Sequence, residues 1–442
     1  MGIVDMIMVG KLGVHSIAAV GFGEIIVFTL IVAIGISLMT ATQTMTARRY
    51  GQNLFSRCSE CLLNGQILGL LLGTPFMILG YFYCGKFITL FINDPLTIRE
   101  CTDYASIQFL GILFPISCFI YRGFYTGIQK TSIYLKVVLI SNLINIYLNI
   151  GLIFGREAIS DYFFSFQFLF IHKLGLLWTF FPFPELGVSG AAIGTVIASA
   201  VSFLCFFFYY FTNGIYSKYK ITKLYLDYSF IGKQLKLTWP IIKREGSFFI
   251  GITLLIAIMG LIGNIELAAS NIIMRIYGIA IMPAVGIGSA CASIVSYFLG
   301  QKQADQSWFT IKDSLRYTLF IMGGFAFLFA IFPKQIISVF SSDPTLLQVA
   351  IPLLRFLAVF AIIDGIVLVL TCTLEGAGDM NFIARISLIF IWIIFIPLAY
   401  LTGIYLNLGM WGPWISWMLG FLYLMFMLIN RTIKGYWRTI SI

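Results

Sequence analysis

The chain has 442 residues, of which 60% are hydrophobic and only 10% are charged, and it carries a formal net charge of +10. A soluble domain contains roughly a quarter charged residues, so this composition excludes a soluble globular protein and indicates an integral membrane protein. The positive charge could suggest a nucleic-acid partner, but its distribution indicates membrane topology instead, and we expect no nucleic acid to bind.

Eleven apolar segments are long enough to cross a bilayer, because a spanning helix needs about 20 mostly apolar residues. In chain order they are roughly 15–42, 59–84, 104–126, 132–154, 189–212, 235–262, 267–297, 311–332, 349–374, 382–403 and 409–430. A twelfth segment, 1–11, is too short to cross, and we interpret it as the end of a truncated first helix. No basic region precedes it, as a signal peptide would require. The expected fold class is therefore an all-α, multi-pass membrane protein.

Lysine and arginine are distributed unequally between the two sides of the membrane. If the first helix runs outward, the inner loops and the tail hold seventeen of these residues. The outer connections hold only Lys11, Lys86, Arg99, Arg156, Lys173 and Lys334. Basic residues concentrate in cytoplasmic loops, so the pattern predicts a plasma-membrane protein, or an inner-membrane protein in a Gram-negative source, with a cytoplasmic C-terminus.

The two halves of the chain repeat one another at a spacing of 249 to 250 residues. The landmarks of the first half are Gly10, Gly51, Asp94, Pro95 and Gly127, and they return as Gly260, Gly300, Asp343, Pro344 and Gly376. Duplicated halves in a membrane chain indicate a transporter with its pathway between them. We expect an N-terminal bundle over 1–212, a cytoplasmic linker over 213–234, and a C-terminal bundle with a short basic tail over 235–442.

An outer segment, 155–186, has no counterpart in the second half. Alternating phenylalanines and Trp178 give it the character of an interfacial loop, because aromatic side chains favour the membrane surface. An external lid is the alternative interpretation.

Enzyme chemistry is poorly supported, and we expect no catalytic residue and no cofactor. The two histidines, His15 and His172, are far apart in the sequence, and no phosphate-binding glycine loop follows a strand. Cys58 and Cys61 form a lone CxxC, whereas a structural zinc site needs four ligands.

Ionisable residues at membrane depth are the strongest functional candidates, because each costs at least about 2.5 kcal/mol to insert and usually faces a cavity or a partner. They are Asp5, Glu24, Glu245, Arg275 and Asp364. Arg122 and Arg355 lie nearer helix ends and could snorkel, and we expect Glu375 and Asp379 to be solvated in an inner loop. Asn142, Asn145 and Asn149 share one helix face, either lining a cavity or bonding a neighbouring helix.

Several motifs resemble the multidrug and toxic compound extrusion family, the MATE transporters, along essentially the whole chain. VDMIMVGKLG at 4–13 resembles its first-helix signature, and TARRYG at 46–51 and SYFLGQ at 296–301 resemble the ends of its second and eighth helices. SNLINIYLNIGLI at 141–153, LGVSGAAIGT at 186–195 and IIMRIYGIAIMPAVGIG at 272–288 resemble its fifth, sixth and eighth helices. The resemblance implies a twelve-helix fold of two pseudo-symmetric six-helix bundles that opens alternately to each side.

The same resemblance implies a secondary antiporter that exports cationic or amphiphilic drugs or metabolites in exchange for Na⁺ or H⁺. Carried over by position, the coupling residues are Asp5, Asn145, Asn149 and Thr195 in the first bundle and Asp364 and Glu245 in the second. Glu24, Arg275 and Asn142 are the substrate-cavity candidates. A Na⁺ ion at Asp5 is the one metal expected. For Glu245 an ion-paired helix end is an open alternative, because Lys243 and Arg244 precede it.

The expected partners are small organic cations or amphiphiles and membrane lipid, and the expected state is a monomer. A flippase of a lipid-linked saccharide is the alternative function within the same superfamily. Such a substrate carries pyrophosphate and would favour a more cationic cavity than these mainly acidic residues provide.

Overall fold

The structure is a computed structural model that describes residues 2–164, 178, 182–212, 214–219, 228–340 and 343–442. Helices and their connections account for all of these residues, and no strand occurs within these ranges. Ten helices are long and apolar enough to cross a membrane, and the bent pair α4 (Pro95–Leu110) and α5 (Leu113–Gly127) gives an eleventh span. The prediction of an all-α, multi-pass membrane protein is confirmed.

The chain forms two compact units, which we call the N-unit and the C-unit. The N-unit comprises Met1–Met39, Ser59–Tyr125 and Lys130–Leu226. The C-unit comprises Thr40–Cys58, Thr126–Gln129 and Asp227–Ile442. The ends of α2 and α5 therefore belong to the C-unit, although most of each helix belongs to the N-unit.

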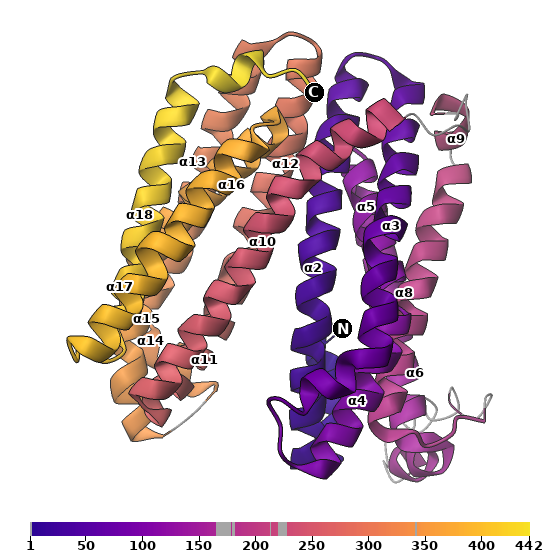
Figure 1. Ribbon diagram of the computed structural model, residues 1–442, viewed down its shortest axis with the longest axis vertical. Helices are drawn as coiled ribbons and strands as arrows, with labels where there is room; N and C mark the ends of the chain where they lie inside the picture. The colour runs from indigo at the N-terminus through magenta and orange to yellow at the C-terminus, as the bar shows by residue number, and fades with distance from the viewer. Residues whose placement is uncertain (1, 165–177, 179–181, 213, 220–227, 341–342) are drawn as a thin grey trace. The chain divides into compact units, whose positions relative to one another are not determined.

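The helices of the first half are drawn from indigo to magenta in Figure 1. In addition to α4 and α5 they are α1 (Gly2–Val9), α2 (Val14–Gly51), α3 (Phe55–Ile88), α6 (Thr131–Phe164), α8 (Gly187–Phe211) and α9 (Ile215–Lys218). The short α1 packs against α6 and α8, and α6 and α8 pack closely against each other. This three-helix contact positions the site described below.

The helices of the second half continue from pink to yellow in Figure 1. They are α10 (Tyr228–Ile262), α11 (Asn264–Ala280), α12 (Met282–Gly300), α13 (Ala304–Ile331), α14 (Pro333–Ser338), α15 (Pro344–Ala377), α16 (Met380–Ile389), α17 (Ile396–Tyr400) and α18 (Trp411–Ile433). Two π-helical segments, η2 (Phe390–Phe395) and η3 (Leu401–Tyr405), flank α17, and a 3₁₀ turn, η4 (Tyr436–Thr439), follows α18. The long α15 packs against α12, α13 and α18.

Two boundaries differ from those expected from the sequence, and one expected segment is only partly described. The span expected over 267–297 is interrupted at Ile281, where α11 ends and α12 begins with Pro283 in its first turn. Helix α10 begins at Tyr228, within the expected linker, because a helix can extend beyond the apolar core that hydropathy detects. Of the outer segment 155–186, residues 165–177 and 179–181 lie outside the described part, so its expected role stays a prediction.

The repeat appears in the structure as matched helix starts. Asp94 caps α4 by accepting a 2.9 Å hydrogen bond from the Thr97 backbone N–H, and Pro95 occupies the first turn. Asp343 caps α15 by accepting a 2.9 Å hydrogen bond from the Thr345 backbone N–H, again followed by proline. Aspartate caps and first-turn prolines both favour a helix start, so the duplicated pair begins the corresponding helix in each half.

Within the C-unit, matched glycines also make matched close contacts. A side chain at Gly127 would press on the carbonyl of Gln43, and one at Gly376 would press on the carbonyl of Ala292. The separation in sequence between Gln43 and Ala292 equals the separation between Gly127 and Gly376. Glycine therefore recurs here because corresponding helices approach too closely for a Cβ atom.

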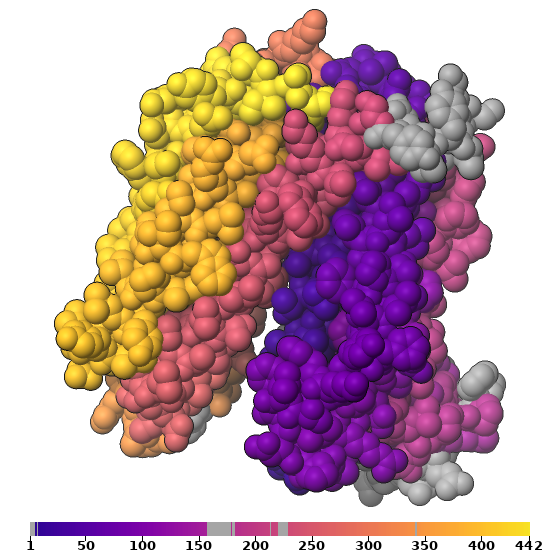
Figure 2. All heavy atoms as spheres, viewed as in Figure 1, coloured from indigo at the N-terminus to yellow at the C-terminus, as the bar shows by residue number. Residues whose placement is uncertain are grey.

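The last residues of the chain lie across one end of the C-unit, as the yellow spheres in Figure 2 show. Arg48 donates a 3.0 Å hydrogen bond to the Ile440 carbonyl, and Arg49 donates one of 3.0 Å to the carbonyl of Ile442. Trp437, in the same segment, is fully buried and donates a 2.9 Å hydrogen bond to the Thr432 carbonyl.

Candidate functional site

The carboxylate of Asp5 is the centre of a buried polar cluster in the N-unit. Asp5 on α1 accepts a 2.5 Å hydrogen bond from Asn149 Nδ2 on α6 and a 2.8 Å hydrogen bond from Thr195 Oγ1 on α8. Asn145 Nδ2, one turn from Asn149, donates to Thr195 Oγ1 at 3.0 Å. The structure thus brings together all four residues expected for the first bundle.

The close approach of α6 and α8 makes this cluster possible. A side chain at Gly190 would meet the backbone of Leu152, and a side chain at Gly194 would meet the Oδ1 atom of Asn149. Small residues four apart on a membrane helix let two backbones approach, so Asn149 reaches Asp5 directly. Neither glycine was identified as a site residue, although the GxxxG spacing within 190–194 was visible in the sequence.

Two oxygen atoms of the cluster lack a hydrogen-bond partner among the described residues. Asn145 and Asn149 are fully buried, and the Oδ1 atom of each accepts no hydrogen bond from that part of the chain. A buried amide oxygen without a donor costs about 1–3 kcal/mol, so such atoms require an explanation. With the Asp5 carboxylate and the Thr195 hydroxyl they form an all-oxygen set of the kind that hard cations prefer.

A cavity of about 400 Å³ adjoins this cluster, and residues of the N-unit line all of it. Asp5, Glu24, Asn142 and Thr195 contribute polar groups to its wall. Tyr104, Phe119 and Tyr134 are among the aromatic lining residues. The structure places Glu24 and Asn142 on one cavity with Asp5, and no cation pairs with Glu24 among the described residues.

The C-unit candidates have a different setting. Tyr277 on α11 donates a hydrogen bond to Asp364 on α15. Arg275, on the same helix as Tyr277, is exposed, and within the described chain no carboxylate pairs with it. The sequence did not predict Tyr277 as a partner of Asp364, and only its position within the 272–288 motif could have indicated it.

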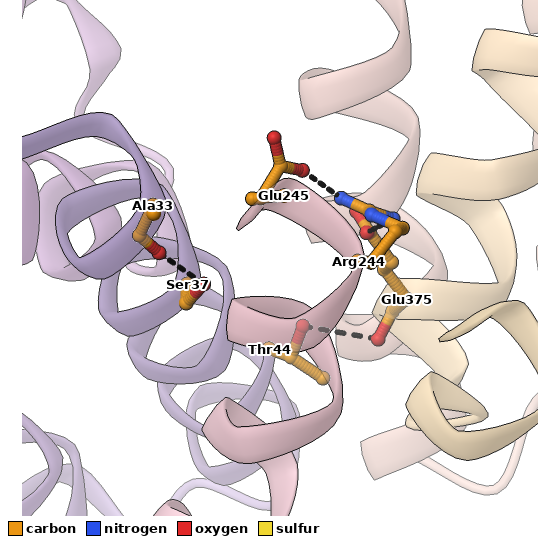
Figure 3. A network of polar contacts seen from close by, with 6 residues as sticks. All are labelled: Ala33, Ser37, Thr44, Arg244, Glu245 and Glu375. Carbon is orange, nitrogen blue, oxygen red and sulfur yellow. Dashed lines mark hydrogen bonds and ion pairs between the residues drawn. The ribbon is translucent and has the colours of Figure 1, made fainter. Parts of the chain in front are cut away.

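Glu245, the other candidate of the C-unit, forms an ion pair. Arg244 donates a 2.5 Å hydrogen bond to Glu245 on the same helix, and it also forms an ion pair with Glu375 at the end of α15 (Figure 3). Thr44 donates a 3.1 Å hydrogen bond to the Glu375 carbonyl. Of the two interpretations left open for Glu245, the structure therefore contains the ion pair, and its partner is Arg244.

The expectation that Glu375 and Asp379 are solvated is wrong. Helix α15 continues to Ala377, so Glu375 is helical and only 5% exposed. Asp379 is also buried and accepts a 2.7 Å hydrogen bond from Arg431 Nε. Each carboxylate has a cation that is distant in the sequence, and composition alone does not show such a pairing.

Comparison with known proteins identifies the family. The MatE family model matches residues 1–150 and 246–401, one match in each half of the chain. The chain belongs to the MatE family. The resemblance to the MATE transporters is thereby confirmed, and MatE proteins are membrane transporters rather than enzymes.

Two relatives align along nearly the whole of this MatE protein. A probable multidrug resistance protein NorM of Agrobacterium fabrum (strain C58 / ATCC 33970) is 26% identical over 94% of this chain and 85% of its own length. The probable multidrug resistance protein YoeA of Bacillus subtilis (strain 168) is 24% identical with the same two coverages. A crystal structure of MATE in the bent conformation superimposes with a TM-score of 0.83, at 20% identity, and covers 99% of this chain and 90% of its own. This likeness shows a shared fold.

Proposed function

We propose that this MatE-family protein is a secondary antiporter that exports cationic or amphiphilic drugs or metabolites in exchange for inward-moving Na⁺ or H⁺. The names of the NorM and YoeA relatives support multidrug export as the general activity. The single observation that carries the coupling is the buried carboxylate of Asp5 beside the cavity, with which no side-chain cation of the described residues forms an ion pair.

The chemistry of the Asp5 cluster suits either coupling ion. A Na⁺ ion could take ligands from Asp5, from Thr195 Oγ1 and from the two unpartnered amide oxygens, all of which are oxygen atoms. A proton could instead bind the Asp5 carboxylate, because burial without a cationic partner disfavours the charged form. Either event removes one net negative charge from the cavity wall.

The loss of that charge is the basis of the proposed exchange. An organic cation in the cavity is attracted by Asp5 and Glu24, and entry of Na⁺ or H⁺ at Asp5 weakens this attraction. In the proposed cycle the ion binds from outside and the substrate leaves to the outside, after which the inward-open state reloads with substrate. One cation moving inward contributes about 2.3 kcal/mol per 100 mV, so the membrane potential biases the cycle without ATP.

The test is gradient-driven efflux of a fluorescent organic cation from proteoliposomes, under an imposed Na⁺ gradient and, separately, an imposed H⁺ gradient. We expect Asp5→Asn to abolish the dependence of efflux on the active gradient. Asp103→Asn is the matched control, because Asp103 is an exposed aspartate of α4 in the same unit. Efflux that stays coupled in Asp5→Asn would refute the proposed role of Asp5, and absence of efflux in the unmodified protein would refute export of cations.

A further inference from the structure

The cavity beside Asp5 continues into a second cavity that contains a basic residue. This second cavity has a volume of about 170 Å³, and its wall includes Arg122 of α5. Residues that line both cavities are Pro115, Phe119, Tyr134, Val138, Asn142 and Ser199. The two cavities therefore form adjoining parts of one hollow within the N-unit, with Asp5 and Glu24 in one part and Arg122 in the other.

Arg122 has an incomplete set of partners. Its guanidinium lies 4.4 Å from the centre of the Tyr134 ring, and no carboxylate pairs with it among the described residues. Arginine at membrane depth usually pairs with an acid or faces water, because its insertion is costly. Stacking on an aromatic face holds the plane of a guanidinium and leaves its N–H groups free to bind an anion.

Helix α8 contributes hydroxyl groups to the walls of both cavities. Thr195, Ser199 and Ser202 are spaced by four and three residues, so they lie on one face of the helix. Thr195 contacts Asp5, whereas Ser202 lines the part with Arg122. The Ser202 hydroxyl makes no hydrogen bond within the described chain, and Ser199 donates its proton to the Thr195 carbonyl at 2.9 Å. Ser202 thus leaves a free donor beside Arg122.

The two charged parts lie a defined distance apart. Ser202 is seven positions after Thr195, and a rise of 1.5 Å per residue places them about 10 Å apart along α8. Aromatic and apolar side chains, including Phe119 and Pro115, line the space between the acidic and basic parts. This arrangement matches a small amphiphile with a cationic group at one end and an anionic group at the other.

We propose that Arg122, held by Tyr134 and assisted by Ser202, is an anion-binding subsite that makes the N-unit cavity selective for zwitterionic amphiphiles. The guanidinium and the hydroxyl donate hydrogen bonds to a carboxylate of the exported compound, while Asp5 and Glu24 attract its cationic group. The inference rests on the proposed function, because it assigns a substrate class to the same cavity.

The test compares two dyes that differ only in this anionic group. Rhodamine B carries a carboxylate beside its cationic ring system, and its ethyl ester lacks the negative charge. Binding of each dye to the purified protein is measured by fluorescence anisotropy for the unmodified chain, Arg122→Gln and Arg99→Gln. Arg99 is an exposed arginine of α4 in the N-unit and serves as the matched control.

We expect Arg122→Gln to weaken rhodamine B binding by about ten-fold or more, since a hydrogen bond to a charged group is lost, and to leave ester binding unchanged or stronger. Arg99→Gln should alter neither affinity. Equal weakening of both dyes, no change for either dye, or no binding of rhodamine B to the unmodified protein would overturn the proposal. Gradient-driven efflux of the ester tests the antiport function separately, because the ester does not need the anion subsite.

Discussion

Replacement of Gly194 by alanine tests whether close packing of α6 and α8 maintains the Asp5 cluster. The new Cβ atom would lie well inside the 3.4–4 Å of ordinary van der Waals contact with Asn149 Oδ1. Relief of this overlap requires the amide to move by roughly 1 Å, or the two helices to separate by a similar distance. Either movement changes the geometry at Asp5 without removing any polar group.

The expected change in ion dependence follows from the hydrogen bond between Asn149 and Asp5. Asn149 Nδ2 lies 2.5 Å from Asp5 Oδ1, so a shift of roughly 1 Å takes the pair beyond the normal limit of about 3.2 Å for a hydrogen bond. A hydrogen bond to a charged group contributes about 1.5–3 kcal/mol, which corresponds to a ten- to hundred-fold change in an equilibrium constant. We therefore expect Gly194→Ala to shift the ion concentration that half-activates efflux by about ten- to a hundred-fold. The shift is to higher concentrations if the coupling ion is Na⁺, because the Asn149 Oδ1 ligand moves away, and to lower concentrations if it is H⁺, because the charged form of Asp5 loses a hydrogen bond.

The assay is the dependence of dye efflux on the Na⁺ or H⁺ concentration in proteoliposomes, together with thermal unfolding of each variant. Gly323→Ala is the control, because Gly323 lies within α13 and has open space around its Cα atom. This control should keep normal coupling and gain about 0.5–1 kcal/mol of helix stability. Ion dependence that is unchanged in Gly194→Ala would refute the argument that the glycine positions Asn149.

Two further variants test other contacts of the chain. Arg244→Met should lower the free energy of unfolding by about 3–5 kcal/mol, because it leaves the buried carboxylate of Glu375 without its cation, and the double change with Glu375→Met should recover most of the loss in a chemical unfolding titration. The Thr97 hydroxyl and then its backbone N–H hold the pKa of Asp94 below its usual value. The folded state is therefore favoured at pH values above about 4 and loses this contribution as the pH falls through the lowered pKa. Asp94→Asn should reduce the fall in melting temperature below that pH, and an identical pH profile in the variant would contradict the capping role.

Hydropathy and the repeat predicted the fold because both can be read from the sequence without knowing which distant segments make contact. Apolar length fixes which segments cross the bilayer, and the pair Asp94–Pro95 and its copy at 343–344 begin helices through contacts within four residues. The break at Ile281 was not predicted, because apolar residues continue across it without interruption. Hydropathy measures transfer into lipid and contains no information about the direction of a helix.

Residue spacing alone placed Asn145 and Asn149 on one helix face, because they lie one turn apart. The grouping of these two residues with Asp5 and Thr195 came from the resemblance to the MATE family, and in the structure Asn149 contacts Asp5 and Asn145 contacts Thr195. Pairings that join distant segments were not accessible in this way. Arg244 meets Glu375 across 131 positions, so the neutralisation of that carboxylate depends on the packing of α10 against the rest of the C-unit.

The two halves share a backbone repeat but differ in the partners of their buried carboxylates. In the C-unit, Arg244 compensates Glu245 and Glu375, whereas Asp364 accepts a hydrogen bond from the neutral Tyr277. In the N-unit, the printed partners of Asp5 among the described residues are neutral donors, and Asp5 lies beside a cavity that Glu24 also lines.

A carboxylate without a cation can exchange one, whereas a carboxylate already paired must first break that pair. We therefore expect different roles for two of the charged groups: under the proposed function Asp5 couples the ion, whereas the ion pair of Glu375 with Arg244 stabilises the C-unit. Asp5→Asn should remove ion dependence and preserve thermal stability, whereas Glu375→Gln should lower stability and preserve ion dependence. Loss of ion dependence in Glu375→Gln, with coupling kept in Asp5→Asn, would contradict this division.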